Sequence, residues 1–260
     1  MPFHSHNSLR YYTFPLLDGQ AVLHGVFTRQ GGVSPQPWAS LNQGGTVGDE
    51  RVHVVENRRR VFAALDLPVE SVYDAWQVHG THVICTQQPR PLDAPHEKAD
   101  IILTDRPGIS LFMRFADCVP VVLYDPRRRV VGLVHAGWRG TVGRAAGVAV
   151  ARMSEQYGSR PEDVLAGVGP SICTAHYEVG EEVQRAARAA FGAQAEHLLV
   201  QTAGGVHFDL WGANRFALQE AGVRQVEVAG LCTACHTEDW FSHRAEHGQT
   251  GRFGAIIALA

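Results

Sequence analysis

The sequence predicts an α/β (α+β) single domain over residues 1–260, in which a mixed β-sheet core is flanked by helices. The chain has 260 residues and 45% of them are hydrophobic, which is enough to bury a substantial core. Segments with helical periodicity alternate with short apolar runs rich in β-branched and aromatic residues. Because no low-complexity linker and no long repeat interrupts this pattern, we expect one domain, with residues 1–20 partly mobile.

Four segments show the periodicity of amphipathic helices, over about residues 49–65, 142–158, 181–192 and 209–222. Gly158 and Gly192 are expected to end the second and third helices. Glu181 and Glu182 favour the start of the third helix, because acidic side chains stabilise the amino end of a helix. Asp209 is the expected N-cap of the fourth.

Six apolar runs are predicted as strands of a largely buried sheet, over residues 101–103, 109–115, 119–124, 130–134, 226–228 and 253–259. Asp125 and Pro126 form a turn signal between two of these runs. The two runs should therefore pair as an antiparallel hairpin, which makes the sheet mixed. The Gly/Pro-rich residues 30–48 are expected to form a long structured loop.

Composition excludes several classes of function. The 23 basic and 26 acidic residues give a net charge of −3, too balanced for non-specific nucleic-acid binding. Lys98 is the only lysine, so lysine-based catalysis has one poorly placed candidate. No long apolar run and no signal-peptide pattern is present, so we expect a cytoplasmic protein without a membrane partner. Five cysteines and 14 histidines favour thiol, metal or acid–base chemistry over a disulfide framework.

Reactive side chains follow three of the apolar segments. His79 lies in the segment 76–80, Cys118 in 116–120 and His135 in 134–140. Since the predicted hairpin joins the last two segments, Cys118 and His135 should lie side by side. A thiolate and an imidazole at such a point suit a zinc site, a Cys/His nucleophile pair or simple core packing.

Small and polar residues beside these groups favour a site over core packing. Gly80, Gly137 and Gly140 allow the backbone to approach a ligand closely or to turn sharply. Trp138 and Arg139 offer a stacking face and an anion-binding guanidinium. One cysteine and two histidines also match a catalytic zinc site, which has three protein ligands and an open position.

The sequence blocks around these residues identify a family. The blocks that carry the resemblance cover residues 24–32, 40–42, 47–49, 77–80, 116–120, 135–140, 169–170, 177–179, 232–233, 241–244 and 250–252. They resemble the YfiH/YlmD laccase-domain family in residue type and order. The resemblance implies a fold related to the catalytic domain of cytotoxic necrotizing factor toxins. It also implies that His79, Cys118 and His135 bind one catalytic zinc ion.

The same resemblance implies a purine nucleoside phosphorylase that acts on adenosine, inosine, guanosine and methylthioadenosine, with adenosine deaminase activity. Members were earlier described as copper polyphenol oxidases. Its partners are then a purine nucleoside and phosphate. Since zinc can lower the pKa of bound water to about 7, one metal site could serve both reactions. The sequence does not specify the oligomeric state, and a monomer is compatible with it.

Phosphorolysis needs groups that hold an anion and groups that stabilise the leaving base. The candidates for contacts with nucleoside or phosphate are Arg29, Asn42, Arg139, Arg244 and Arg252. Asp117, beside Cys118, is a candidate proton carrier, although strand alternation would point its side chain to the opposite face. The family usually has a second basic residue after Arg244, but here Ala245 and Glu246 follow. This departure favours Arg252 or Arg29 for the phosphate.

Three other functions remain open. The first is a hydrolase that uses Cys118 as nucleophile and His135 as base. The second is a copper polyphenol oxidase, which is disfavoured because His4 and His6 form the chain's one His-x-His pair. The third is a non-catalytic binding module that uses the loop 30–48 as its contact surface.

A second metal site is a weaker signal. Cys232, Cys235 and His236 match a haem-attachment motif, but covalent haem is not expected in a cytoplasmic protein. With His243 and His247 the two cysteines imitate a zinc finger, yet only seven residues separate the pairs. We therefore expect Cys232 to pack in the core, with Cys235 and His236 on a loop.

Overall fold

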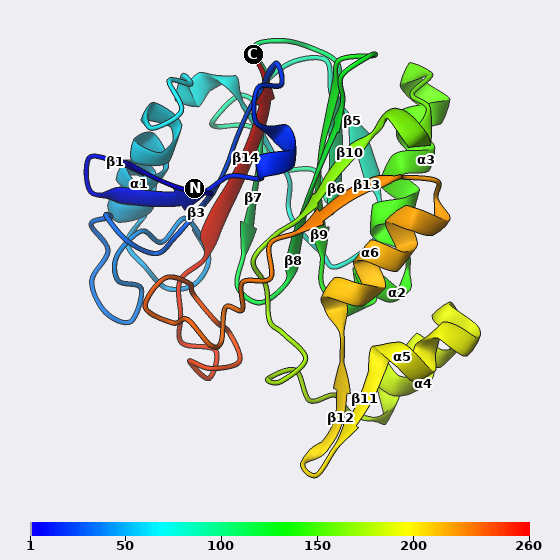
Figure 1. Ribbon diagram of the computed structural model, residues 1–260. Coiled ribbons are helices and arrows are strands. Elements are labelled where there is room, and N and C mark those ends of the chain that lie inside the picture. Colours follow the sequence, from blue (N-terminus) through cyan, green and yellow to red (C-terminus); the bar gives the residue numbers. More distant parts are fainter. Residues whose placement is uncertain (1) are drawn as a thin grey trace.

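Two six-stranded sheets form the centre of the molecule, which a computed structural model describes over residues 2–260 (Figure 1). The first sheet has the order β1-β2-β3-β14-β7-β4, with bounds Phe3–His6, Leu9–Tyr12, Val22–Phe27, Phe253–Leu259, Ser110–Phe115 and Val72–Asp74. The second has the order β13-β10-β8-β9-β6-β5, with bounds Gln225–Val228, Leu165–Val168, Val119–Asp125, Val130–Ala136, Ile101–Thr104 and Val83–Cys85. Both sheets combine parallel and antiparallel pairs, which confirms a mixed architecture.

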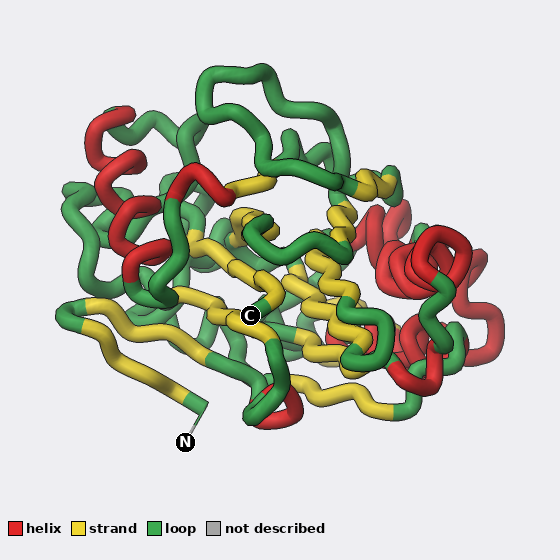
Figure 2. Tube along the Cα trace, turned by 90° about the horizontal axis from the view of Figure 1, so that it is seen from above, coloured by secondary structure: helices red, strands yellow, loops and turns green. Residues whose placement is uncertain are grey.

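Helices cover the outer faces of the stacked sheets (Figure 2). α1 (Arg51–Ala63) packs on the first sheet. The helices that cover the second sheet are α2 (Trp138–Val142), α3 (Ala145–Tyr157) and α6 (Leu210–Glu220). At one end of the molecule, α4 (Glu181–Phe191), α5 (Ala195–Leu198) and the hairpin of β11 (Leu199–Thr202) and β12 (Gly205–Phe208) lie together (Figure 1). Short 3-10 helices cover Pro15–Leu17, Val69–Ser71, Pro161–Asp163 and Gly192–Gln194.

Side chains along β8 point alternately to its two faces, and both faces are apolar, which explains why other elements cover the strand on each side. Val122 and Tyr124 belong to the core between the two sheets, whereas Val121 and Leu123 belong to the core beneath the helices. All four are buried. A strand that is apolar on both faces must be covered on both, and here a second sheet covers one face. The prediction of one sheet core was therefore incomplete.

The predicted hairpin is confirmed. β8 and β9 are antiparallel, and Asp125 accepts the amide N–H groups of Arg127 and Arg128 at 2.8 and 3.0 Å in the turn. The register places Pro120 opposite His135. The six predicted strands all exist, but those at 110–115 and 253–259 belong to the first sheet and the others to the second.

The helices predicted over 49–65, 181–192 and 209–222 agree closely with the structure, whereas the one predicted over 142–158 starts elsewhere. Asp209 caps α6 by accepting the N–H of Gly212. The helix expected over 142–158 is split, because Arg144 adopts a left-handed conformation with φ of 57°. Arg144 donates to the carbonyl of Ala190 and pairs with Glu220, which holds the break in place. α3 therefore begins at Ala145, and Val142 ends α2.

Several elements were not predicted. The structure places residues 3–12 in β1 and β2, and it adds β3, β4, β5, β10 and the β11–β12 hairpin. Most of these strands are too short for the two-residue alternation of apolar and polar side chains to be recognised in the sequence. Over residues 2–260, no helix has the length and apolar character to span a membrane.

Candidate metal centre and cleft

Three candidate ligands come together where the two sheets meet. His79 follows β4, Cys118 lies on the loop between β7 and β8, and His135 lies in β9. Their ligand atoms are all within 4.8 Å of one another. The antiparallel register of β8 and β9 brings Cys118 beside His135, as the sequence predicts. His79 has a φ of 62°, so its backbone adopts a left-handed turn at this point.

Asp100 organises this group, although the sequence analysis did not select it. Its buried carboxylate accepts the amide N–H groups of Val78, His79 and Gly80 at 3.1, 3.0 and 2.7 Å. The Nδ1 of His135 lies 2.7 Å from the same carboxylate. An acidic residue directly before the apolar run 101–104 was the available signal, since a buried carboxylate requires partners.

The electrostatics of the group favour a cysteine thiolate. Burial raises the pKa of Cys118, but the charges of His135 and His79 and their hydrogen bonds outweigh it and lower the pKa to about 6. Burial lowers the pKa of His135, yet Cys118 and the hydrogen bond to Asp100 raise it to about 9. Desolvation also raises the pKa of Asp100, and His135 more than reverses this shift. A thiolate is the form that binds a metal and also the form that acts as a nucleophile.

The surroundings of the group fit a zinc ion. A Cβ atom at Gly137 would lie 2.9 Å from Cδ2 of His79 and 3.0 Å from Sγ of Cys118, so the space beside the ligands requires glycine here. Asp100 occupies Nδ1 of His135 and leaves Nε2 for a ligand. Two imidazoles and one thiolate are the donors that zinc prefers, and three ligands leave a position open.

The three candidate ligands line a cleft of about 1150 Å³. Aromatic faces in its wall come from Trp76, Trp138 and Tyr177. Guanidinium groups come from Arg51, Arg58, Arg90, Arg114, Arg139, Arg244 and Arg252. A cleft of this size, with aromatic and cationic walls, suits an aromatic molecule together with an anion.

The comparisons with known proteins identify the family. A family model described as multi-copper polyphenol oxidoreductase laccase matches residues 23–260. The chain belongs to this family. It is 43% identical over 239 residues to a protein of Deinococcus radiodurans named purine nucleoside phosphorylase, covering 92% of this chain and 90% of the relative. It is 36% identical to Bacillus subtilis purine nucleoside phosphorylase YlmD, covering 93% of this chain and 90% of the relative.

The fold of this laccase-family chain also matches solved structures. The crystal structure of the Bacillus licheniformis hypothetical protein YfiH superimposes with a TM-score of 0.92 and 33% identity, covering 100% of this chain and 99% of that chain. These matches confirm the YfiH/YlmD resemblance that the sequence blocks predict.

Three of the residues predicted to contact substrate line the cleft: Arg139, Arg244 and Arg252. Arg139 stacks on Trp138, with its guanidinium carbon 4.4 Å from the ring centroid. Arg244 donates to the carbonyl of Glu178 at 3.2 Å. Arg252 donates to the carbonyl of Gly251 at 2.8 Å. Each of these arginines lines the cleft while a backbone or aromatic contact holds it in place.

Arg29 and Asn42 are not among the residues that line the cleft. Arg29 pairs with Glu246 at 2.9 Å and stacks on the ring of Phe241. Asn42 is fully buried, and its Oδ1 accepts the amide N–H groups of Gly44 and Arg252, both at 2.9 Å. Both side chains thus have partners within the fold. Asn42 contributes to the cleft indirectly, because it holds the backbone of Arg252, which lines the cleft.

Asp117 lies in the cleft wall, but not on a strand. It has a φ of 76° in the loop before β8, so strand alternation does not set the direction of its side chain. Its carboxylate accepts from the hydroxyl of Thr233 at 2.6 Å and from the amide of Arg244 at 2.7 Å. Asp117 therefore ties the segment around Arg244 to the loop that carries Cys118.

A cationic cluster that the sequence analysis did not select forms another part of the cleft. Asp74 is buried and contacts Arg90 at 2.7 Å, Arg114 at 2.8 Å and Arg58 at 3.8 Å. His96 lies 3.0 Å from the same carboxylate. The three arginines carry more positive charge than one carboxylate cancels. Because they come from three distant segments of the sequence, only the fold reveals the cluster.

Proposed function

We propose that the protein is a zinc-dependent purine nucleoside phosphorylase with adenosine deaminase activity. The observation that carries this proposal is the group of His79, Cys118 and His135 in the wall of a cleft that also holds aromatic and guanidinium groups. Relatives named purine nucleoside phosphorylase support it. Adenosine, inosine, guanosine and methylthioadenosine are the proposed substrates, each with phosphate.

The chain's own residues would hold the zinc ion at the cleft wall. His79, Cys118 and His135 supply the ligand atoms, and Asp100 fixes the ring of His135 so that Nε2 faces the site. A bound zinc ion supplies a Lewis acid with an open position. One feature supports zinc over a multicopper cluster: within residues 2–260, neither candidate group has more than two histidines, whereas a trinuclear copper cluster needs several His-x-His pairs.

In phosphorolysis, an oxygen of phosphate forms a bond to C1′ of the ribose as the bond from C1′ to the base nitrogen breaks. The electron pair of that bond goes to the base, which takes up a proton. Arg244 and Arg252 are proposed to hold the phosphate, because guanidinium groups bind phosphate oxygens in pairs. Trp138 or Tyr177 is proposed to stack on the purine. Asp117 is proposed to position Arg244.

Deamination takes place at another atom of the same nucleoside, C6 of the purine, with water as the nucleophile. Water adds to C6 of adenosine and ammonia leaves, which gives inosine. Both reactions depend on the groups around Cys118, but only phosphorolysis consumes phosphate. Their different dependence on phosphate therefore separates them in one assay.

The experiment is to incubate the purified protein with adenosine, with and without phosphate, and to measure adenine, ribose 1-phosphate and inosine. We expect adenine and ribose 1-phosphate only with phosphate. Inosine should form in both conditions, and with phosphate part of it should be consumed by phosphorolysis. Cys118→Ala should lose both activities, whereas Cys85→Ser, a free cysteine outside the cleft lining, should keep them. Equal rates for wild type and Cys118→Ala would contradict the proposal. Turnover of an acyl substrate that alkylation of Cys118 abolishes would instead support the hydrolase.

A further inference from the structure

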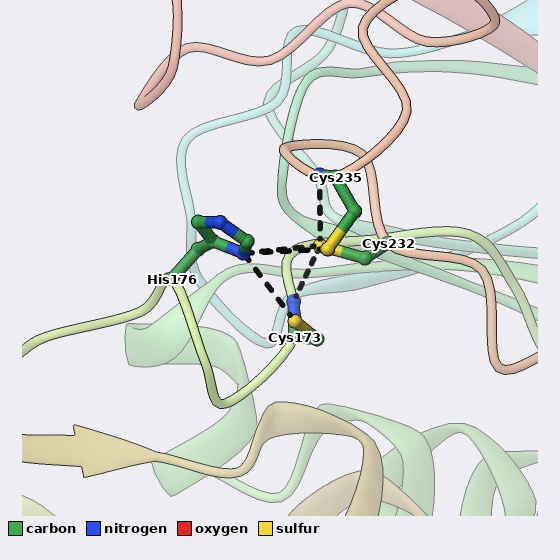
Figure 3. A group of neighbouring side chains, drawn as sticks. All are labelled: Cys173, His176, Cys232 and Cys235. Atoms are coloured by element: carbon green, nitrogen blue, oxygen red, sulfur yellow. Dashed lines mark hydrogen bonds between the residues drawn. The ribbon is translucent and has the colours of Figure 1, made fainter. Parts of the chain in front are cut away.

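A second group of metal-type ligands lies outside the first. Cys173 and His176 follow β10, and Cys232 and Cys235 follow β13 (Figure 3). Their ligand atoms all lie within 4.8 Å of one another, and none of the three cysteines forms a disulfide. Figure 3 shows the imidazole of His176 directed at the three sulfur atoms.

The distances within this group match tetrahedral zinc. The Nδ1 of His176 lies 3.6 Å from Sγ of Cys173, 3.9 Å from Sγ of Cys232 and 3.4 Å from Sγ of Cys235. With zinc–sulfur and zinc–nitrogen bonds of about 2.3 and 2.0 Å, a tetrahedral angle separates nitrogen and sulfur by about 3.5 to 3.6 Å. One nitrogen thus lies within about 0.4 Å of this separation from three sulfurs at once, which a chance contact of thiols does not require.

The backbone of both segments is folded as metal-binding turns are. The spacings are Cys-x-x-His and Cys-x-x-Cys. The amide of His176 donates to the carbonyl of Cys173 at 3.1 Å, and the amide of His236 donates to the carbonyl of Cys232 at 3.2 Å. The amide N–H groups of Cys173 and Cys235 also point at Sγ of Cys232, at 3.3 and 3.4 Å. Hydrogen bonds of this kind fix the position of a ligand atom, as those around metal ligands do.

We propose that Cys173, His176, Cys232 and Cys235 bind a structural zinc ion. Three thiolates and one imidazole are a ligand set of closed, four-coordinate zinc sites. The site goes beyond the proposed function, since it has no open position for a substrate and its ligands are separate from His79, Cys118 and His135.

The ion would fasten two segments that form the cleft wall. Tyr177, which lines the cleft, directly follows His176, and the guanidinium of Arg244 donates to the carbonyl of His176 at 3.4 Å. Thr233 lies between the two cysteines of the second turn and donates to Asp117. The metal would therefore fix the position of the wall that holds Tyr177 and Arg244.

Two ligands of this site, Cys232 and Cys235, were considered from the sequence as part of a metal site, but with the wrong partners. Cys232 is buried and Cys235 is on a loop, as predicted. His243 and His247, however, are not in the group, and His243 lines the cleft instead. Cys173 and His176 were missed because 55 residues separate His176 from Cys232 in the chain, a spacing that no finger motif has.

The test counts zinc in protein purified under reducing conditions, by elemental analysis against protein concentration. We expect about two zinc ions per chain in wild type and about one in Cys118→Ala, in Cys235→Ser and in Cys173→Ser. The double variant Cys118→Ala/Cys235→Ser should contain none. Cys85→Ser is the matched control, because Cys85 belongs to neither group, and it should keep both ions.

Cys118→Ala keeps the test decisive even if the variants of the second group do not fold, because it leaves that group intact. Reconstituted with Co²⁺, Cys118→Ala should give the intense sulfur-to-cobalt absorption of a tetrahedral thiolate site. A Cys118→Ala protein that is folded but binds neither Zn²⁺ nor Co²⁺ would overturn the proposal, and so would an unchanged zinc count in folded Cys235→Ser. These readouts do not use activity, so they stand even if the phosphorylase assignment fails.

Discussion

Asp100 joins His79 to His135: one carboxylate oxygen lies 3.0 Å from the amide nitrogen of His79 and 2.7 Å from Nδ1 of His135. The same side chain thus fixes the backbone of one candidate ligand and the ring of another. A carboxylate that accepts from Nδ1 selects the tautomer with a free Nε2 and makes that nitrogen a better donor to a metal. The site is therefore organised by a residue that does not itself belong to the ligand group.

Replacing Asp100 with Asn should weaken the metal site without removing a ligand. The amide cannot act as a charged acceptor for the ring, so we expect the zinc affinity of the His79, Cys118 and His135 group to fall about 10- to 100-fold. Competition with a chelator measures it. Asp93→Asn, at an exposed position, is the control and should leave the affinity unchanged. An unchanged affinity in Asp100→Asn would show that the carboxylate does not tune the site.

Gly137→Ala should disturb the same group by steric contact. The added Cβ would lie 2.9 Å from Cδ2 of His79, so a ligand must move. We expect zinc to be lost from this site while the helices persist, as measured by zinc content and circular dichroism. Gly180→Ala is the control, because its Cβ would meet nothing within 4 Å. Full zinc content in Gly137→Ala would contradict the geometry.

Asp74→Asn should destabilise the protein, because it leaves the buried charges of Arg90 and Arg114 without a counter-ion. Removing one partner from a buried ion pair costs about 3–5 kcal/mol in the free energy of unfolding. Urea unfolding at pH 7 measures this. Glu56→Gln, which breaks the more solvent-accessible pairs with Arg59 and Arg60, should cost less than about 1 kcal/mol. Equal losses in the two variants would mean that burial of the Asp74 cluster does not matter.

The effect of Asp74 should also depend on pH. Burial raises its pKa, but the hydrogen bond from His96 and the charges of Arg114 and Arg58 outweigh this and hold the pKa far below its ordinary value of 3.8. With the pKa lowered in the folded state, the stabilisation is complete above 3.8 and is lost as pH falls toward the folded pKa. The difference between wild type and Asp74→Asn should be constant from pH 7 to 5 and shrink below pH 4. A difference in stability that grows as the pH falls would contradict a lowered pKa of Asp74 in the folded state.

Arg252→Gln and Arg29→Gln should affect different quantities. Arg252 lines the cleft, so its loss should raise KM for phosphate about tenfold or more. This factor corresponds to the free energy of one hydrogen bond to a charged group. Arg29 pairs with Glu246 away from the cleft lining, so its loss should lower Tm by several degrees and leave KM unchanged. Steady-state kinetics and thermal unfolding of both variants measure this contrast. A raised KM in Arg29→Gln alone would restore Arg29 as the phosphate contact.

Features set by neighbouring residues could be predicted from the sequence, whereas contacts between distant parts of the chain could not. The turn at Asp125 and the N-cap at Asp209 are local, and both were predicted correctly. Cys118 and His135 were paired correctly because one hairpin joins them. Asp74 meets its arginines, and Cys173 meets Cys232, across long stretches of chain, and no local pattern encodes such contacts. The relation to the toxin catalytic domain, the single-domain boundary and the cytoplasmic location stay predictions.

The loop that carries Cys118 also crosses from one sheet to the other, since β7 belongs to the first sheet and β8 to the second. His79 follows a strand of the first sheet, whereas His135 lies within the second. An ion held by all three would link the two sheets directly at this point. Its removal should therefore weaken the packing of one sheet on the other, and the fall in Tm when a chelator is added would measure that contribution.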